Sequence, residues 1–157
     1  MNCANNYVLK IKKLHADSQL PTLGSAHAAG YDLYAYLNDE YSVSPRRITI
    51  KPHQTIKVGT GITAAIPHGY FGAIFARSGL ATKQGLRPAN CVGVVDEDYR
   101  GEFIVALHND TDKPQTIMHG DRIAQLVLLP YMRAQVREVD ELDETERGTG
   151  GFGSTGA

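Results

Sequence analysis

The sequence predicts an all-β domain, a sandwich or barrel of short strands with one short helix. Apolar and polar residues alternate with the period of two that is typical of strands in residues 48–51, 55–58, 62–66 and 103–107. Proline, glycine and asparagine separate these segments, so we expect tight turns between short strands. The turn residues are Pro45, Pro52, Gly59, Gly61, 67–69, 109–110 and 120–121.

The helix is predicted over residues 79–85. Ser78 is the candidate N-cap, because its hydroxyl can accept a backbone N–H of the first turn. Gly85 is typical of a helix end, since glycine readily takes the left-handed conformation. Residues 90–103 are predicted as strand, turn and strand, with acidic residues and Tyr99 at the bend.

The 157 residues fit one domain that buries roughly 70% of its unfolded surface. We assign residues 1–137 to this single all-β domain. Residues 138–146 carry six carboxylates in nine positions and are expected to form a solvated acidic connector. Residues 147–157 form a glycine-rich C-terminal arm, which at roughly 3.3 Å per residue extends on the order of 35 Å, enough to reach a neighbouring subunit.

Charge and composition exclude several classes of function. Sixteen basic and seventeen acidic residues give a net charge of −1, which argues against binding of nucleic acid polymers or anionic membranes. No signal peptide or membrane span is present in the sequence, so a cytoplasmic protein is expected. Cys3 and Cys91 lack the spacing of a metal site, and the six histidines lack the spacing of zinc enzymes.

The C-terminal arm has two interpretations. Phe152 is its one aromatic residue among five glycines, so the arm cannot bury enough apolar surface to order itself, and a disordered linker is one interpretation. The other is a lid over a nucleotide. Glycine N–H groups approach anions closely, Arg147 and the hydroxyls donate to phosphate, and Phe152 offers a face for stacking.

Three further segments carry candidate chemistry. Arg77 and Ser78 stand at a helix start and suit phosphate, although a simple cap beside a surface arginine is equally consistent. Asp96 ends an apolar run, where partial desolvation would prepare its carboxylate to accept a proton from water, and Tyr99 can pack against a sugar or a nucleobase. The alternative is that this segment is a solvated turn rich in acidic residues. Asp32 lies between apolar neighbours and needs a partner, either Mg²⁺ through water or a structural hydrogen bond. Gln125 is the odd polar residue of a predicted strand.

Five segments in order resemble the five motifs of the deoxyuridine triphosphatase (dUTPase) family. They are Ala-Gly-Tyr-Asp-Leu (29–33), Arg-Ser-Gly-Leu-Ala (77–81), Gly-Val-Val-Asp-Glu-Asp-Tyr-Arg-Gly (93–101), Gly-Asp-Arg-Ile-Ala-Gln (120–125) and Arg-Gly-Thr-Gly-Gly-Phe-Gly-Ser-Thr-Gly (147–156). One departure is Ala76, where the family usually has proline; it removes no donor or acid.

The resemblance implies a jelly-roll-like β-clip fold and hydrolysis of dUTP to dUMP and pyrophosphate, which supports dTTP synthesis and keeps uracil out of DNA. Asp96 would activate the water that attacks the α-phosphorus, Asp32 would orient waters of Mg²⁺, and Tyr99 would lie against the deoxyribose. Phosphates would be held by Arg77, Ser78, Gly79 and Gln125. Uracil would be read by Asn90 and by backbone groups around Val94, Val95 and Ile104.

The resemblance also assigns the arm and the assembly. Phe152 would cover the uracil, and the γ-phosphate would lie near Arg147, Gly153, Ser154 and Thr155. The sites would lie between the subunits of a homotrimer. Two rivals are a deoxycytidine triphosphate deaminase of related fold and a non-catalytic nucleotide-binding protein; the arm and the Asp96 segment favour the triphosphatase.

Overall fold

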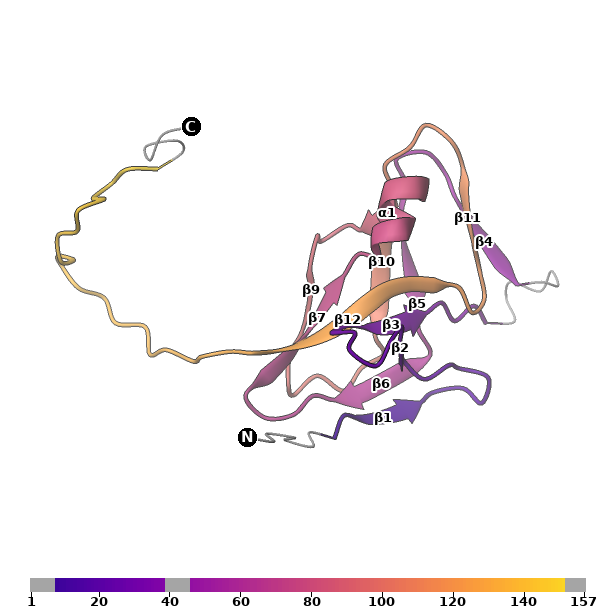
Figure 1. Cartoon of the computed structure of the whole chain (residues 1–157), viewed down its shortest axis with the longest axis horizontal. Coiled ribbons are helices and arrows are strands. Elements are labelled where there is room, and N and C mark those ends of the chain that lie inside the picture. The colour runs from indigo at the N-terminus through magenta and orange to yellow at the C-terminus, as the bar shows by residue number, and fades with distance from the viewer. Residues whose placement is uncertain (1–7, 39–45, 152–157) are drawn as a thin grey trace.

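The computed structural model describes residues 8–38 and 46–151 and is built almost entirely of β-strands (Figure 1). The strands are β1 (Lys10–Lys13), β2 (Thr22–Leu23), β3 (Tyr31–Tyr34), β4 (Arg47–Ile50), β5 (Thr55–Gly59), β6 (Ile62–Ala65), β7 (Tyr70–Phe75), β8 (Leu86–Pro88), β9 (Gly93–Val95), β10 (Ile104–Asn109), β11 (Gln115–Met118) and β12 (Arg122–Pro130). The helix α1 (Ser78–Gln84) lies between β7 and β8. The all-β prediction is therefore confirmed.

The strands form two larger antiparallel sheets that share one core. One sheet has the order β2-β3-β12-β7-β9 and the other β5-β10-β8, with the pairs β1-β6 and β11-β4 beside them. Leu126 and Ile74 from the first sheet join Val105 and Leu107 from the second in a single buried apolar cluster. Phe103 is 1% exposed and fills the space at the start of β10. Packing of the two sheets on this cluster gives the jelly-roll-like sandwich.

The four strands expected from alternation are present as β4, β5, β6 and β10, with ends that differ by one or two residues. The predicted cap of the helix is wrong by one position. Arg77 is the N-cap with extended backbone and makes no side-chain cap bond, while Ser78 is the first helical residue. Gly85 ends the helix as expected, with φ 63° and its N–H donated to the carbonyls of Ala81 and Leu80.

Residues 90–103 do not form the expected pair of adjacent strands. β9 pairs with β7 in the five-stranded sheet, whereas β10 pairs with β5 and β8 in the other sheet. After β9 the Tyr99 N–H donates to the Asp96 carbonyl at 3.1 Å and closes a turn. From this turn the chain crosses from the five-stranded sheet to the other sheet, and we call this segment the crossing. The expectation is wrong because β9 pairs with β7, and a local sequence pattern does not reveal which strand will be the neighbour of another.

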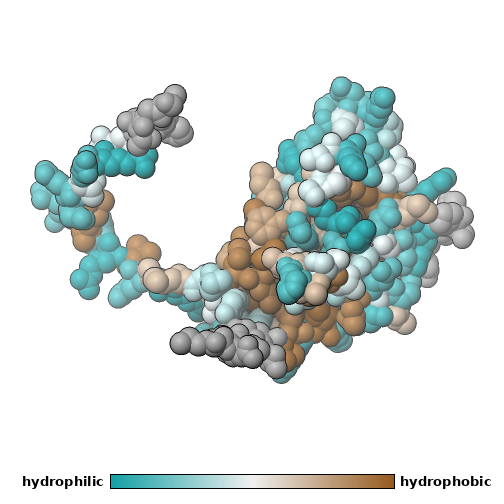
Figure 2. All heavy atoms as spheres, viewed as in Figure 1, coloured by the Kyte–Doolittle hydropathy of each residue, from teal (hydrophilic) through white to brown (hydrophobic). Residues whose placement is uncertain are grey.

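The chain leaves the body at the end of β12 (Figure 1), and from here on 'the arm' means the whole segment after β12, residues 131–157. Residues 132–149 are all exposed, and Figure 2 shows a mostly hydrophilic arm. Phe152, Gly153, Ser154 and Thr155 lie outside the described residues. Among the described residues, no helix has the length and apolar character needed to cross a membrane.

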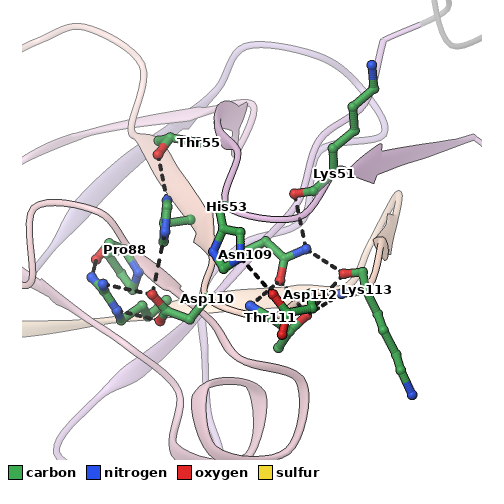
Figure 3. A network of polar contacts seen from close by, with 11 residues as sticks. Lys51, His53, Thr55, Pro88, Asn109, Asp110, Thr111, Asp112 and Lys113 are labelled. Atoms are coloured by element: carbon green, nitrogen blue, oxygen red, sulfur yellow. Dashed lines mark hydrogen bonds and ion pairs between the residues drawn. The ribbon is translucent and has the colours of Figure 1, made fainter.

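Asn109, at the end of β10, is fully buried and organises the adjoining turns (Figure 3). Its Nδ2 donates to the carbonyls of Ile50 at 3.1 Å, Lys51 at 3.1 Å and Lys113 at 2.8 Å. Its Oδ1 accepts from the N–H and the hydroxyl of Thr111. One amide thus bonds to backbone groups of two segments, residues 50–51 and 111–113.

We predict that Asn109→Ala lowers the free energy of unfolding by about 3 kcal/mol, because several buried carbonyls lose their donor. Denaturant unfolding followed by circular dichroism measures this change. Thr116→Ala, at an exposed position on β11, serves as the control and should stay within about 0.5 kcal/mol of the wild type. A loss at Asn109 no larger than that of the control would contradict the role of the amide.

Candidate functional site

A surface pocket of about 460 Å³ gathers four of the predicted phosphate ligands and the predicted metal residue. We call it the arginine pocket; its lining residues are Gly24, Ala28, Ala29, Gly30, Asp32, Arg77, Ser78, Gly79, Arg122, Gln125 and Val127. They come from β3 and the loop before it, from the start of α1 and from β12. The structure therefore brings Arg77, Ser78, Gly79, Gln125 and Asp32 together in one pocket.

Asp32 is held by two arginines. Arg77 Nε donates to its Oδ1 at 2.8 Å, and Arg122 Nη1 donates to its Oδ2 at 3.1 Å. The carboxylate side chain is only 12% exposed, so it needs these partners. Of the two alternatives left open by the sequence, the structural hydrogen bond is present. The sequence analysis did not find Arg122, because antiparallel pairing of β3 with β12 brings it from 90 residues away.

The arginine pocket has more positive than negative charge. Two guanidinium groups face one carboxylate, and Arg122 remains 49% exposed. Ser78 and Gly79 are exposed at the rim. A guanidinium has five N–H donors, and Arg77 uses one for Asp32 and one for the Arg122 carbonyl. This arrangement suits an anion with several oxygen acceptors.

Gln125 supports the loop that carries Arg77. It lies in register between Asp32 on β3 and Phe75 on β7, and its Nε2 donates to the Ala76 carbonyl at 2.9 Å. Gly30 makes room for it, because a Cβ at Gly30 would lie 2.7 Å from Gln125 Oε1. Gln125, for which the resemblance implied a phosphate contact, therefore also fixes the backbone just before Arg77.

Asp96 lies in a second pocket, of about 450 Å³, which we call the acid pocket. Its lining residues are Phe71, Val94, Asp96, Glu97, Asp98, Tyr131 and Arg133. Asp96 is exposed, so the partial burial expected from its apolar run is absent in the single chain. The reason is its place just after β9, an edge strand of the five-stranded sheet.

The residues predicted to contact the sugar and the nucleobase lie on both sides of the crossing between β9 and β10. Tyr99 is 44% exposed and donates its hydroxyl to the Glu102 carbonyl at 3.1 Å, which leaves part of its ring open. Val94 and Ile104 are exposed, and so is Asn90, whereas Val95 is 7% exposed and faces the core. Only the backbone of Val95 is available to a ligand.

The acid pocket and the arginine pocket share no lining residue. Val95 pairs with Gly72 near the start of β7, whereas Arg77 follows the end of that strand. At about 3.3 Å per residue, Asp96 and Arg77 are separated by roughly 15 to 20 Å along the sheet. One chain therefore does not place the acid next to the arginines.

In the part of the chain that the structure describes, no group of three or more histidine, cysteine, aspartate or glutamate side chains is arranged so that it could hold a metal ion. Asp32 is the carboxylate of the arginine pocket, and each of its oxygens has a second lone pair beyond the bond to arginine. The residues present fit a hydrated divalent ion that Asp32 meets through water, and its other ligands would be water and phosphate.

Arg147 makes a local turn within the arm and contacts neither pocket. Its Nε donates to the Gly150 carbonyl at 2.9 Å, and the Gly150 N–H donates to the Arg147 carbonyl at 3.1 Å. Arg147 therefore lines neither pocket of its own chain.

Comparison with known proteins shows which family the sequence and the fold resemble. The family model described as dUTPase matches residues 16–156. The deoxyuridine 5'-triphosphate nucleotidohydrolase of Desulfitobacterium hafniense is 47% identical to this chain, and the match covers 97% of this chain and 98% of that protein. The enzyme of the same name from Candida albicans is 46% identical, over 94% of this chain and 87% of its own length. A variant of the Staphylococcus bacteriophage 80alpha dUTPase with dUpNHpp superposes with a TM-score of 0.84 at 25% identity, covering 96% of this chain and 99% of its own. These proteins define a class of all-β nucleotide hydrolases.

The chain belongs to the dUTPase family. The dUTPase of phage phi11 of S. aureus, at 21% identity and a TM-score of 0.75, shares the fold, with 88% of this chain and 100% of its own covered.

Proposed function

We propose that this chain is a cytoplasmic dUTP diphosphatase that hydrolyses dUTP to dUMP and pyrophosphate. The observation that carries the proposal is the Asp32–Arg77–Arg122 cluster, which leaves positive charge at an open pocket. The family match, which includes the Asp96 segment, identifies the substrate that this pocket would receive. Asp96, exposed in the other pocket, supplies the carboxylate that such a reaction requires.

The arginine pocket binds the triphosphate in this proposal. Asp32 orients the Arg77 guanidinium, so that its remaining N–H donors meet phosphate oxygens at little entropic cost. The Ser78 hydroxyl and the Gly79 backbone add donors at the rim, and Gln125 keeps the loop in place. Mg²⁺, when bound to the triphosphate, supplies charge neutralisation. Asp32 would accept hydrogen bonds from the water molecules bound to Mg²⁺.

Asp96 is the general base in this proposal. It accepts a proton from a water molecule that attacks the α-phosphorus, and pyrophosphate leaves on the opposite side. Closing of the arm would exclude bulk water and supply the desolvation that the single chain lacks. Arg147, Ser154 and Thr155 of the arm would then donate to the γ-phosphate, beside Gly153, and Phe152 would cover the base.

Selection of the substrate would take place at the crossing between β9 and β10. The open part of the Tyr99 ring would lie against the deoxyribose and exclude a 2′-hydroxyl. Asn90 and the backbone at Val94, Val95 and Ile104 would pair with the uracil edge and leave no space for a 5-methyl group. Ribonucleotides and thymidine nucleotides would therefore be rejected.

The separation of the two pockets supports a homotrimer with sites between subunits. The acid pocket of one chain and the arginine pocket of another would face the same nucleotide. The outer face of the five-stranded sheet is suited to such contact, because Phe71 and Leu129 are opposed on it and are partly exposed. Figure 2 shows apolar surface on the body where the arm leaves it.

We predict that Asp96→Asn binds dUTP with little change but lowers kcat by roughly 100- to 10,000-fold, because the water loses its base. Release of pyrophosphate from dUTP with Mg²⁺ measures turnover, and calorimetry with a non-hydrolysable analogue measures binding. The same assay on dCTP, with detection of ammonia, tests the deaminase alternative. Ammonia without pyrophosphate, or undiminished turnover in the variant, would reject the proposal.

We predict that two inactive variants restore each other's activity when mixed. Asp96→Asn and Arg77→Ala each damage a different pocket, so a mixed trimer contains some sites in which both residues are intact. Equal random mixing by co-refolding leaves about one quarter of the sites intact and should recover about a quarter of wild-type turnover. Absence of recovery would mean that Asp96 and Arg77 of the same chain act together.

We predict that ending the chain after Glu146 leaves a folded oligomer with a kcat lowered by about tenfold or more, because the site can no longer exclude water. Circular dichroism and size-exclusion chromatography check the fold and assembly, and pyrophosphate release gives kcat. A full-length chain with Glu144→Gln in the exposed connector is the control. Unchanged kcat in the truncated chain would identify the arm as a linker.

A further inference from the structure

Glu97 follows Asp96 directly but has a different environment. Its side chain is 15% exposed, whereas Asp96 and Asp98 on either side are exposed. The Gly69 N–H donates to Glu97 Oε2 at 2.7 Å. Arg133 Nη2 donates to Oε1 at 3.3 Å, and His68 Nδ1 lies 3.2 Å from the same oxygen. This carboxylate therefore joins the turn between β6 and β7 to the first residues of the arm.

The root of the arm is held by several contacts around Glu97. The Tyr131 N–H donates to the Gly69 carbonyl at 3.1 Å, so Gly69 binds Glu97 through one backbone group and Tyr131 through the other. The Tyr131 ring meets Phe71 edge-on at 6.4 Å, and the Arg133 guanidinium lies 5.5 Å from the Tyr131 ring centre. We call Gly69, Glu97, Tyr131 and Arg133 the arm clasp.

The charge state of the arm clasp agrees with its geometry. The N–H of Gly69 lowers the pKa of Glu97, although partial burial acts in the opposite direction, and bonds from Tyr131 and His68 add to the lowering. The pKa of Tyr131 is raised by partial burial and by its bond to Glu97. Glu97 is therefore ionised, and Tyr131 protonated, near neutral pH.

The arm clasp is the last attachment of the described arm to the body. Beyond Arg133, the hydrogen bonds of the described arm residues join only positions 145–150 to one another. Residues 134–149 are all exposed. The direction in which the chain leaves the body is therefore determined at Tyr131 and Arg133: Arg133 donates to Glu97 directly, and Tyr131 is joined to Glu97 through Gly69.

We propose that Glu97 is a positioning residue for the arm: it fixes the direction in which the chain leaves β12, so that the lid reaches the site it closes. The proposal rests on the proposed function, in which the arm is that lid. Without the arm clasp, the first residues of the arm are no longer held against the body, and the arm can leave it in more directions. The lid then spends less time at the site, which lowers kcat. Asp96 keeps its own place in the turn, whose Tyr99 N–H to Asp96 carbonyl bond does not involve the Glu97 side chain.

The test compares Glu97→Ala and Arg133→Ala in the full chain and in the chain that ends after Glu146, with dUTP and Mg²⁺. Arg133→Ala removes the partner of Glu97 that belongs to the arm. We expect this variant to fold normally, because the Arg133 side chain is 72% exposed. We expect each variant to lower kcat about 3- to 10-fold in the full chain and to have no effect in the truncated chain. Glu97→Gln should recover part of the loss, since its amide oxygen still accepts from Gly69.

Amide hydrogen exchange at Tyr131 tests the clasp without any substrate. Both Glu97→Ala and Arg133→Ala should speed exchange there, and Glu138→Gln, which changes an exposed acid of the connector, should leave both exchange and kcat unchanged. Equal loss of kcat in full and truncated chains would overturn the proposal, because Glu97 would then act on the body. Unchanged Tyr131 exchange would also overturn it. A wild-type chain without turnover on dUTP would instead reject the proposed function.

Discussion

Strand β12 is hydrogen-bonded to β3 on one side and to β7 on the other, and the proposed site depends on this pairing. The register places Gln125 between Asp32 and Phe75, and directly opposed residues point to the same face of a sheet. The side chains of Asp32 and Gln125 therefore emerge together, beside the loop that carries Arg77. The same strand ends at Pro130, where the chain leaves the body as the arm.

The Asp32 carboxylate shows how stability and binding are combined. A carboxylate that is only 12% exposed is destabilising unless charged donors surround it, and Arg77 and Arg122 provide them. Because two cations surround one anion, the fold is stabilised and positive charge remains for a ligand. Gln125 and Gly30 complete the arrangement by fixing the backbone before Arg77 and by leaving space for the amide.

The fold separates the acid from the phosphate donors. β9, which leads to Asp96, is at one edge of the five-stranded sheet, and β3, which carries Asp32, lies beyond β7 and β12. An exposed acid on one chain is poorly prepared as a base, since water solvates its charge. In the proposed function, a neighbouring subunit and a closed lid supply the apolar surroundings that the open acid pocket of the single chain lacks.

The sequence by itself determined the class of fold and the kinds of residues at the site. Period-two alternation depends on which side chains face the core, so strands such as β5 and β10 were predictable, and Gly85 was predictable as the end of a helix because few other residues adopt φ near 63°. Asp32 was recognisable as a carboxylate that needed a partner.

Only the tertiary structure decided the partners. Arg122 meets Asp32 across 90 residues, and β9 joins β7 although β10 follows it in the chain. In the sequence Glu97 is one of several acids of a turn, whereas in the structure it accepts hydrogen bonds from Gly69 and Arg133. The physical reason is that alternation states which face of a strand is buried, whereas the neighbour of that strand depends on packing between segments distant in sequence.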